Sequence, residues 1–147
     1  MTPGRPAIPP WPGGLAYPRP PAPPPMRPAE AQVWAICAHL GSLLLGFVAP
    51  LVAMIVIGER SPLARRHAVA SLNFQVSLLI YGVGGVLIAV GAVVLATADP
   101  FALVGTLLLV GIFVAAGIAV LILVVVGSVR ASQGMEFRYP LAIPFVR

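Results

Sequence analysis

The thirteen charged residues of this 147-residue chain leave three long stretches without any charge, at residues 31–58, 67–98 and 100–129. A helix needs about 20 consecutive apolar residues to cross about 30 Å of hydrocarbon, and each stretch is longer than that. The chain is 59% hydrophobic and only 9% charged, which is not the composition of a soluble domain. We therefore expect an all-α integral membrane protein, a small helical bundle built on three long hydrophobic segments.

The first hydrophobic segment, which should begin near Glu30, contains a helix breaker. Pro50 follows Gly46 and should interrupt the helix near that point. As one kinked helix, residues 31–57 would measure about 40 Å and could cross the membrane, whereas two legs of about 20 Å each could not. The two-legged form would be a re-entrant hairpin, which a bilayer tolerates only where other helices cover the broken backbone. Both forms stay open, so we expect three or four helices.

Each of the other two segments opens with a capping residue followed by proline. The Ser-Pro pair at 61–62 predicts a helix over 62–97, and the Asp-Pro pair at 99–100 predicts one over 100–132, stopped by Gly134. The first of these would measure about 54 Å, well beyond the hydrocarbon thickness. Its first turns should therefore lie among the lipid headgroups.

Residues 1–29 are expected to form a disordered tail, and residues 30–147 the helical transmembrane domain. Twelve of the 17 prolines fall in the first 28 residues, which cannot bury a core. The tail is either a solvated tether or a docking peptide for a soluble partner. The second interpretation rests on Pro18, Pro21 and Pro24, whose three-residue spacing suits aromatic grooves.

The arginines predict how the protein lies in a bacterial inner membrane, because short loops rich in Arg stay in the cytoplasm. Residues 59–67 and 130–147 hold three arginines each, and the loop near Asp99 holds none. We therefore expect a multi-pass protein with residues 59–67 and the C-terminus in the cytoplasm. The tail also carries three arginines, so we expect it in the cytoplasm too. That placement requires the re-entrant hairpin.

The basic net charge of +5 points to anionic lipid headgroups as partners. The arginines lie at the ends of apolar segments and form no single basic face, so we expect no nucleic-acid binding. The arginines expected to contact anionic lipid are Arg60, Arg65 and Arg66.

Few strong hydrogen-bonding side chains lie at membrane depth, and most gather at the start of the second long helix. The candidate polar packing or pathway residues are His39, His67, Ser71, Asn73, Gln75 and Tyr139. Such side chains usually point inward, where they either bond neighbouring helices at about 0.6–2 kcal/mol per pair or line a polar pathway.

The two amides carry a more specific hypothesis. Asn73 and Gln75 point about 200° apart on a helix, so both can be satisfied only if protein surrounds the helix at that level. We expect the first hydrophobic segment, residues 31–57, and the C-terminal segment to flank it, with His39 and Tyr139 as the candidate partners of the amides.

We expect neither an enzyme nor a bound cofactor or metal. The uncharged stretches hold no acid to act as a base, and the chain has no Lys, nucleophile motif or glycine-rich phosphate loop. Cys37 and His39 lie two apart on a helix and face different directions, which does not suit a metal site.

Small residues predict close helix packing. The second long helix carries one row of them at steps of three and four: Gly82, Gly85, Ala89, Ala92 and Ala96. The third long helix is expected to carry a matching row, made of Gly111, Ala115 and Ala119. The partner helix can belong to the same chain or to a second copy in a homo-oligomer.

Three segments resemble a known family: WAICAHL at 34–40, HAVASLNFQVSLLIY at 67–81 and GMEFRYPLAIPFVR at 134–147. They are similar to a family of small bacterial membrane proteins, a domain of unknown function. That family is similar to the channel-forming Tic component of the chloroplast inner-envelope import machinery. The resemblance covers about residues 30–147 and implies a helical bundle and, through the plastid relative, polypeptide translocation. Family members often have acids just before the histidine, where this chain has Arg65 and Arg66, so cation binding there is not expected.

Two function classes follow. The first is a structural or scaffolding membrane component. The alternative is a subunit of an oligomeric pore or polypeptide translocation channel.

Overall fold

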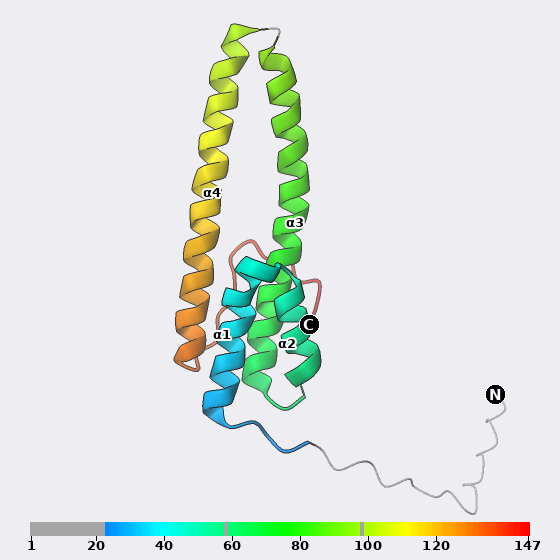
Figure 1. The fold of residues 1–147 in the computed structure, drawn as a ribbon, viewed down its shortest axis with the longest axis vertical. Coiled ribbons are helices and arrows are strands. Elements are labelled where there is room, and N and C mark those ends of the chain that lie inside the picture. The colour runs from blue at the N-terminus through cyan, green and yellow to red at the C-terminus, as the bar shows by residue number, and fades with distance from the viewer. Residues whose placement is uncertain (1–22, 58, 98) are drawn as a thin grey trace, which may run out of the picture.

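The computed structural model describes residues 23–57, 59–97 and 99–147. Those residues form four helices and no strand, which confirms the all-helical prediction (Figure 1). The helices are α1 (Pro28–Leu45), α2 (Val48–Ile57), α3 (Pro62–Ala96) and α4 (Pro100–Ser132). Residues 1–22, most of the predicted disordered tail, lie outside the described residues.

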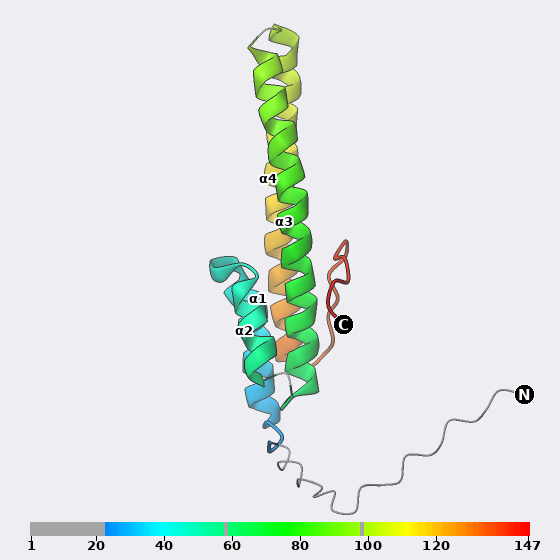
Figure 2. The ribbon, with the colours of Figure 1, turned by 90° about the vertical axis from the view of Figure 1, so that its right-hand side faces the viewer.

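The four helices are arranged as one short hairpin beside one long hairpin (Figure 1). The short hairpin, α1 and α2, packs against only one half of the α3–α4 pair, and the other half extends beyond it. Figure 2 shows the C-terminal segment, residues 133–147, running back along α3 on the side away from α1 and α2. The start of α1, the start of α3 and the end of α4 therefore lie at the same end of the molecule, called here the base.

The break in the first hydrophobic segment lies at Gly46, four residues before the predicted site at Pro50. Gly46 has φ 57° and ψ −134°, a backbone conformation that a residue with a side chain rarely adopts. Pro50 is buried within the first turn of α2, where a helix does not need the proline N–H. Residues 31–57 thus form two legs, and α2, with 10 residues, is only about 15 Å long.

Both predicted helix caps are confirmed. The Ser61 side chain accepts a hydrogen bond from the backbone N–H of Ala64 at 3.2 Å. The Asp99 carboxylate accepts one from the backbone N–H of Phe101 at 2.9 Å. Asp99 therefore serves as a cap at the loop between the two long helices.

The exposed surface of the long hairpin is apolar. Both α3 and α4 are long and apolar enough to cross a membrane. Their free halves expose large side chains such as Leu87 at 69% and Leu108 at 67%. The buried apolar cluster at the base consists mainly of alanines with Ile57. A surface of this kind needs a bilayer as its solvent, which agrees with the prediction of a membrane protein.

The small-residue row of α3 faces α4 except at Gly82, which has open space around it, and the row of α4 does not face α3; packing of the α4 row against a second copy stays a prediction. Gly85 lies against the ring of Phe113, which a Cβ at position 85 would approach to 2.6 Å, and the Ala92 carbonyl lies 3.2 Å from the Thr106 hydroxyl. On α4 the expected row is turned away from α3, because the helix presents Thr106 and Phe113 instead. All three residues of that row are exposed: Gly111, Ala115 and Ala119.

Candidate functional site

Three of the predicted polar residues meet at the base in one buried chain of hydrogen bonds. His39 comes from α1, His67 from α3 and Tyr139 from the C-terminal segment. The His39 ring joins the other two: its Nδ1 lies 2.8 Å from the Tyr139 hydroxyl and its Nε2 lies 2.8 Å from His67 Nδ1. His67 Nε2 lies 3.0 Å from the carbonyl oxygen of Met135. The chain thus links three separate parts of the fold.

For two neutral rings these contacts allow only one direction of donation. A carbonyl oxygen only accepts, so His67 donates from Nε2 to Met135 and accepts at Nδ1. His39 then donates from Nε2 to His67, and its Nδ1 accepts from the Tyr139 hydroxyl. All four ring nitrogens are engaged by protein groups, so neither ring offers a free lone pair to a ligand.

Packing around this chain uses two residues that sequence reasoning missed. The Phe74 ring stacks on the Tyr139 ring with centroids 3.9 Å apart and planes 7° from parallel. Gly127 of α4 leaves room for the chain, because a Cβ there would lie 3.2 Å from both His39 Nδ1 and the Tyr139 oxygen. Burial raises the pKa of the Tyr139 hydroxyl, which keeps it protonated and able to donate. A single sequence does not show that α4 approaches a polar cluster at this point, so nothing in it marks Gly127 as a packing residue.

A second set of bonds straps the C-terminal segment to α3. The Asn73 amide donates to the Val146 carbonyl and accepts from the Val146 N–H, both at 2.9 Å, as a paired strand would. One turn along, the Ser77 hydroxyl accepts from the Ile143 N–H at 2.8 Å. A further turn along, Tyr81 donates to a carbonyl of the same segment. Residues at steps of four on α3 therefore satisfy an extended stretch of backbone.

The expected partners of the two amides are wrong. His39 and Tyr139 bond each other, and Asn73 bonds the C-terminal backbone instead. Gln75 is half-buried and has no hydrogen-bond partner among the described residues. Ser71, another predicted residue, donates to the Ala38 carbonyl of α1 at 2.8 Å. Protein does flank α3 at this level. The groups that bond the Asn73 amide are main-chain groups, however, and no sequence pattern marks them.

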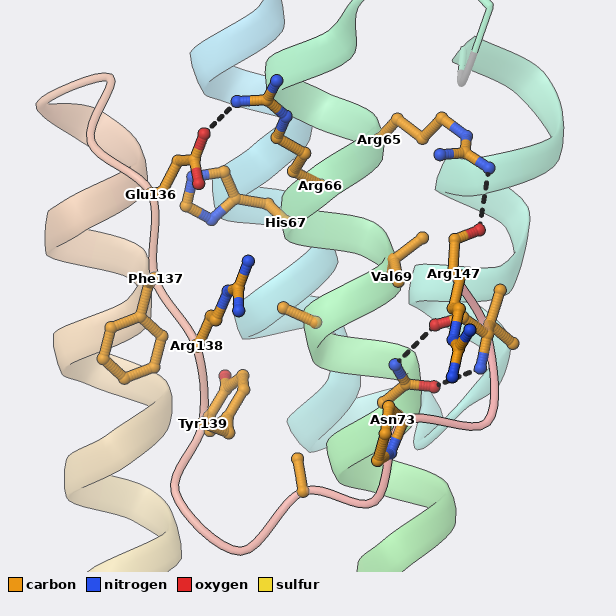
Figure 3. A pocket seen from close by; sticks show the side chains of 14 residues that line it. Arg65, Arg66, His67, Val69, Asn73, Glu136, Phe137, Arg138, Tyr139 and Arg147 are labelled. Carbon is orange, nitrogen blue, oxygen red and sulfur yellow. Dashed lines mark hydrogen bonds and ion pairs between the residues drawn. The ribbon is translucent and has the colours of Figure 1, made fainter.

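Beside the buried chain lies a pocket of about 750 Å³ between α3 and the C-terminal segment (Figure 3). Its charged lining residues are Arg65, Arg66, Glu136, Arg138 and Arg147. Glu136, which sequence reasoning missed, forms an ion pair with Arg66. Of the arginines expected to contact lipid, Arg65 and Arg66 line this pocket and Arg60 does not.

Arg60 lies instead where the start of the described chain meets the loop before α3. Its side chain donates to the Pro24 carbonyl at 3.5 Å, and its own carbonyl accepts from the Met26 N–H at 3.1 Å. Met26 packs against the buried apolar cluster at the base. The last residues of the predicted tail are thus in contact with the helical domain.

No group of three His, Cys, Asp or Glu side chains within residues 23–57, 59–97 and 99–147 is placed to hold a metal ion. The fold and the site together define a small helical membrane protein. A buried polar chain holds its helices at one end, and two long apolar helices extend from that end.

Comparison with known families gives this class a more specific identity. Residues 30–146 match the model of the magnetosome magnetite crystal formation protein family, MamF/MmsF, and the chain belongs to that family. The predicted membership of a bacterial membrane-protein family is thereby confirmed, and the similarity to the Tic component finds no support. No curated protein and no solved structure matches the chain.

Proposed function

We propose that this protein is a structural component of a magnetosome-type membrane, where it contributes to magnetite crystal formation without catalysing a reaction. The family match supports the magnetosome membrane as the location, and the observation that carries the structural role is the hydrogen-bond chain through His39, His67 and Tyr139. A metal-binding histidine needs a free ring nitrogen, and here both nitrogens of each ring are hydrogen-bonded within the fold. Within the described residues, no buried side-chain nitrogen or oxygen lacks a partner. A fully satisfied polar network fixes the arrangement of helices.

In this proposal α3 and α4 cross the bilayer, and the α1–α2 hairpin enters it from the base without crossing. The base carries Arg60, Arg65 and Arg66 and faces anionic headgroups on the cytoplasmic side. The start of α1 lies at the base, together with the start of α3 and the end of α4 (Figure 1). This arrangement therefore puts the N-terminal tail on the cytoplasmic side as well. The arginines at 59–67 and in the C-terminal segment support this orientation.

Cysteine accessibility tests the orientation. With Cys37 replaced by serine, single cysteines are placed at three exposed positions, Glu59, Thr97 and Ser132. In intact cells a membrane-impermeant reagent should label only position 97, and in lysed cells it should label all three. Labelling of position 59 or 132 in intact cells would reverse the orientation.

Complementation tests the function. The chain is expressed in a magnetite-forming bacterium that lacks its own member of the family. We expect it in the magnetosome membrane after alkaline extraction, with the number and size of crystals restored. His39→Leu should lose the rescue because the polar chain is broken, whereas Cys37→Ser, a change on the exposed side of the same helix, should keep it. Full rescue by His39→Leu would contradict the proposed role of the chain.

The alternative, a pore or polypeptide translocation channel made by several copies, has one observation in its favour. The exposed row of Gly111, Ala115 and Ala119 on α4 would let another helix approach closely. Purified protein in planar bilayers should then show discrete conductance steps, which Gly111→Leu should abolish. Docking of a soluble partner on the proline-rich tail stays a prediction, tested by whether any partner is lost when the tail is removed.

A further inference from the structure

The pocket between α3 and the C-terminal segment has lining groups that the hydrogen bonds within the fold do not use. At about 750 Å³ it lies within the range of small-ligand sites. His67 and Tyr139 form part of its lining, but their polar atoms are already hydrogen-bonded. The Tyr139 hydroxyl bonds His39, and the His67 ring bonds His39 and the Met135 carbonyl. What the pocket offers to a ligand is therefore its remaining charged groups and its apolar side chains.

The charged groups leave a clear excess of positive charge. Four arginines and one glutamate line the pocket, and the glutamate is paired with Arg66. Arg65 donates to the main-chain carbonyl of Arg147 at 3.1 Å, which uses part of its guanidinium. The side chains of Arg138 and Arg147 make no hydrogen bond or ion pair within the described part of the chain. Figure 3 shows Arg138 pointing from the C-terminal segment into the space between that segment and α3.

The lining also contains apolar side chains. Val69 and Ala70 contribute them from α3, and Ala142 and Pro144 contribute them from the C-terminal segment. A pocket lined by both arginines and apolar side chains suits a molecule that has an anionic group and hydrocarbon. Guanidinium groups bind phosphate or carboxylate oxygens with two parallel hydrogen bonds, and phosphate is the anionic group that phospholipids present at a bilayer surface.

We propose that this pocket binds the phosphate group of an anionic phospholipid, with Arg138 and Arg66 as its principal ligands and Val69 against the glycerol end. The proposal rests on the proposed placement of the base at the membrane surface. It assigns one lipid to a defined site, beyond the general attraction of basic residues for an anionic leaflet. Glu136 competes with the phosphate for Arg66, so it lowers the affinity of the site.

Native mass spectrometry of the full chain released from a neutral detergent tests the proposal. The probes are phosphatidylglycerol, zwitterionic phosphatidylcholine and inorganic phosphate, each titrated separately. We expect one tightly bound phosphatidylglycerol in the wild type, and weaker binding of the other two. Arg138→Gln should weaken phosphatidylglycerol binding about tenfold, as expected for the loss of a hydrogen bond to a charged group.

Two further variants separate the site from general charge and from damage to the fold. Arg130→Gln removes the same charge from an exposed position at the base outside the pocket, and should change the affinity by less than about twofold. Glu136→Gln should tighten binding, which an unfolded or distorted pocket would not do.

Three results would overturn the assignment. Equal losses in Arg138→Gln and Arg130→Gln would reduce it to general charge, and equal binding of phosphatidylcholine would remove the anionic requirement. Inorganic phosphate bound as tightly as phosphatidylglycerol would make free phosphate the ligand instead of lipid. Because this assay measures binding in detergent, its failure would leave the complementation result for the structural role untouched.

Discussion

Replacing Tyr139 by phenylalanine tests the buried hydrogen-bond chain most directly. The change removes one oxygen and keeps the ring, so stacking on Phe74 is retained. It strands the acceptor at His39 Nδ1, 2.8 Å away. With neutral rings the chain cannot reverse to relieve this loss, because it ends on the Met135 carbonyl, which only accepts.

The expected cost follows from the burial of the site. Tyr139 is only 6% exposed, so water has little access to the stranded nitrogen. An unsatisfied buried acceptor costs about 1–3 kcal/mol, and hydrogen bonds between membrane helices average about 0.6 with a maximum near 1.7 kcal/mol. We therefore expect Tyr139→Phe to lower the free energy of unfolding by about 1–2 kcal/mol. Thermal unfolding in one detergent should show a Tm lower by roughly 4–8 °C.

Tyr81→Phe is the matched control. It removes the same hydroxyl from the same residue type, here from a bond to the Leu141 carbonyl, but Tyr81 is 47% exposed. Solvent can replace that bond, so the cost should stay below about 0.5 kcal/mol. Equal shifts in the two variants would mean that solvent reaches the histidine chain, and the structural interpretation of that chain would fail.

The same unfolding assay checks three other expectations. Asn73→Leu should cost about 1–3 kcal/mol because it strands backbone groups of the C-terminal segment, and Gln75→Leu should cost less than about 0.5; similar values would contradict the strap. Gly85→Leu should destabilise by about 1–3 kcal/mol through its clash with α4, while Gly82→Leu, which enters open space, should be neutral; no difference would mean the long helices separate freely. Deleting residues 2–28 should lower the Tm, because it removes a methionine that packs at the base; an unchanged Tm would show that this contact contributes nothing.

The fold was largely predictable because its helix boundaries depend on local chemistry. Ser61 and Asp99 followed by proline fix where α3 and α4 begin, and these signals act within one turn. The break in the first segment was harder. Proline and glycine four residues apart can both end a helix, and only the structure shows that Gly46 makes the turn while Pro50 starts α2.

The candidate site was predictable in its residue types and not in its pairings. Polar groups at membrane depth are few, so His39, His67 and Asn73 stood out from the sequence. Their partners are set by the rotation of each helix and by the path of the C-terminal segment, which no local rule determines. Two of those partners are main-chain carbonyls, and the carbonyls of Met135 and Val146 look like any others in a sequence.

The two halves of the long hairpin differ in what fixes their packing. In a bilayer, apolar side chains gain little by leaving lipid for a neighbouring helix, so small residues permit an approach without selecting one. The α4 row beginning at Gly111 illustrates this, because it has the right spacing and still faces outward. At the base, the directional bonds of His39 and Tyr139, 100 residues apart, select one arrangement of α1, α3 and the C-terminal segment. Within the described residues, the bond from the Thr106 hydroxyl to the Ala92 carbonyl is the one side-chain hydrogen bond between α3 and α4, so the outer half of the hairpin is the part whose arrangement lipid or a second copy can change.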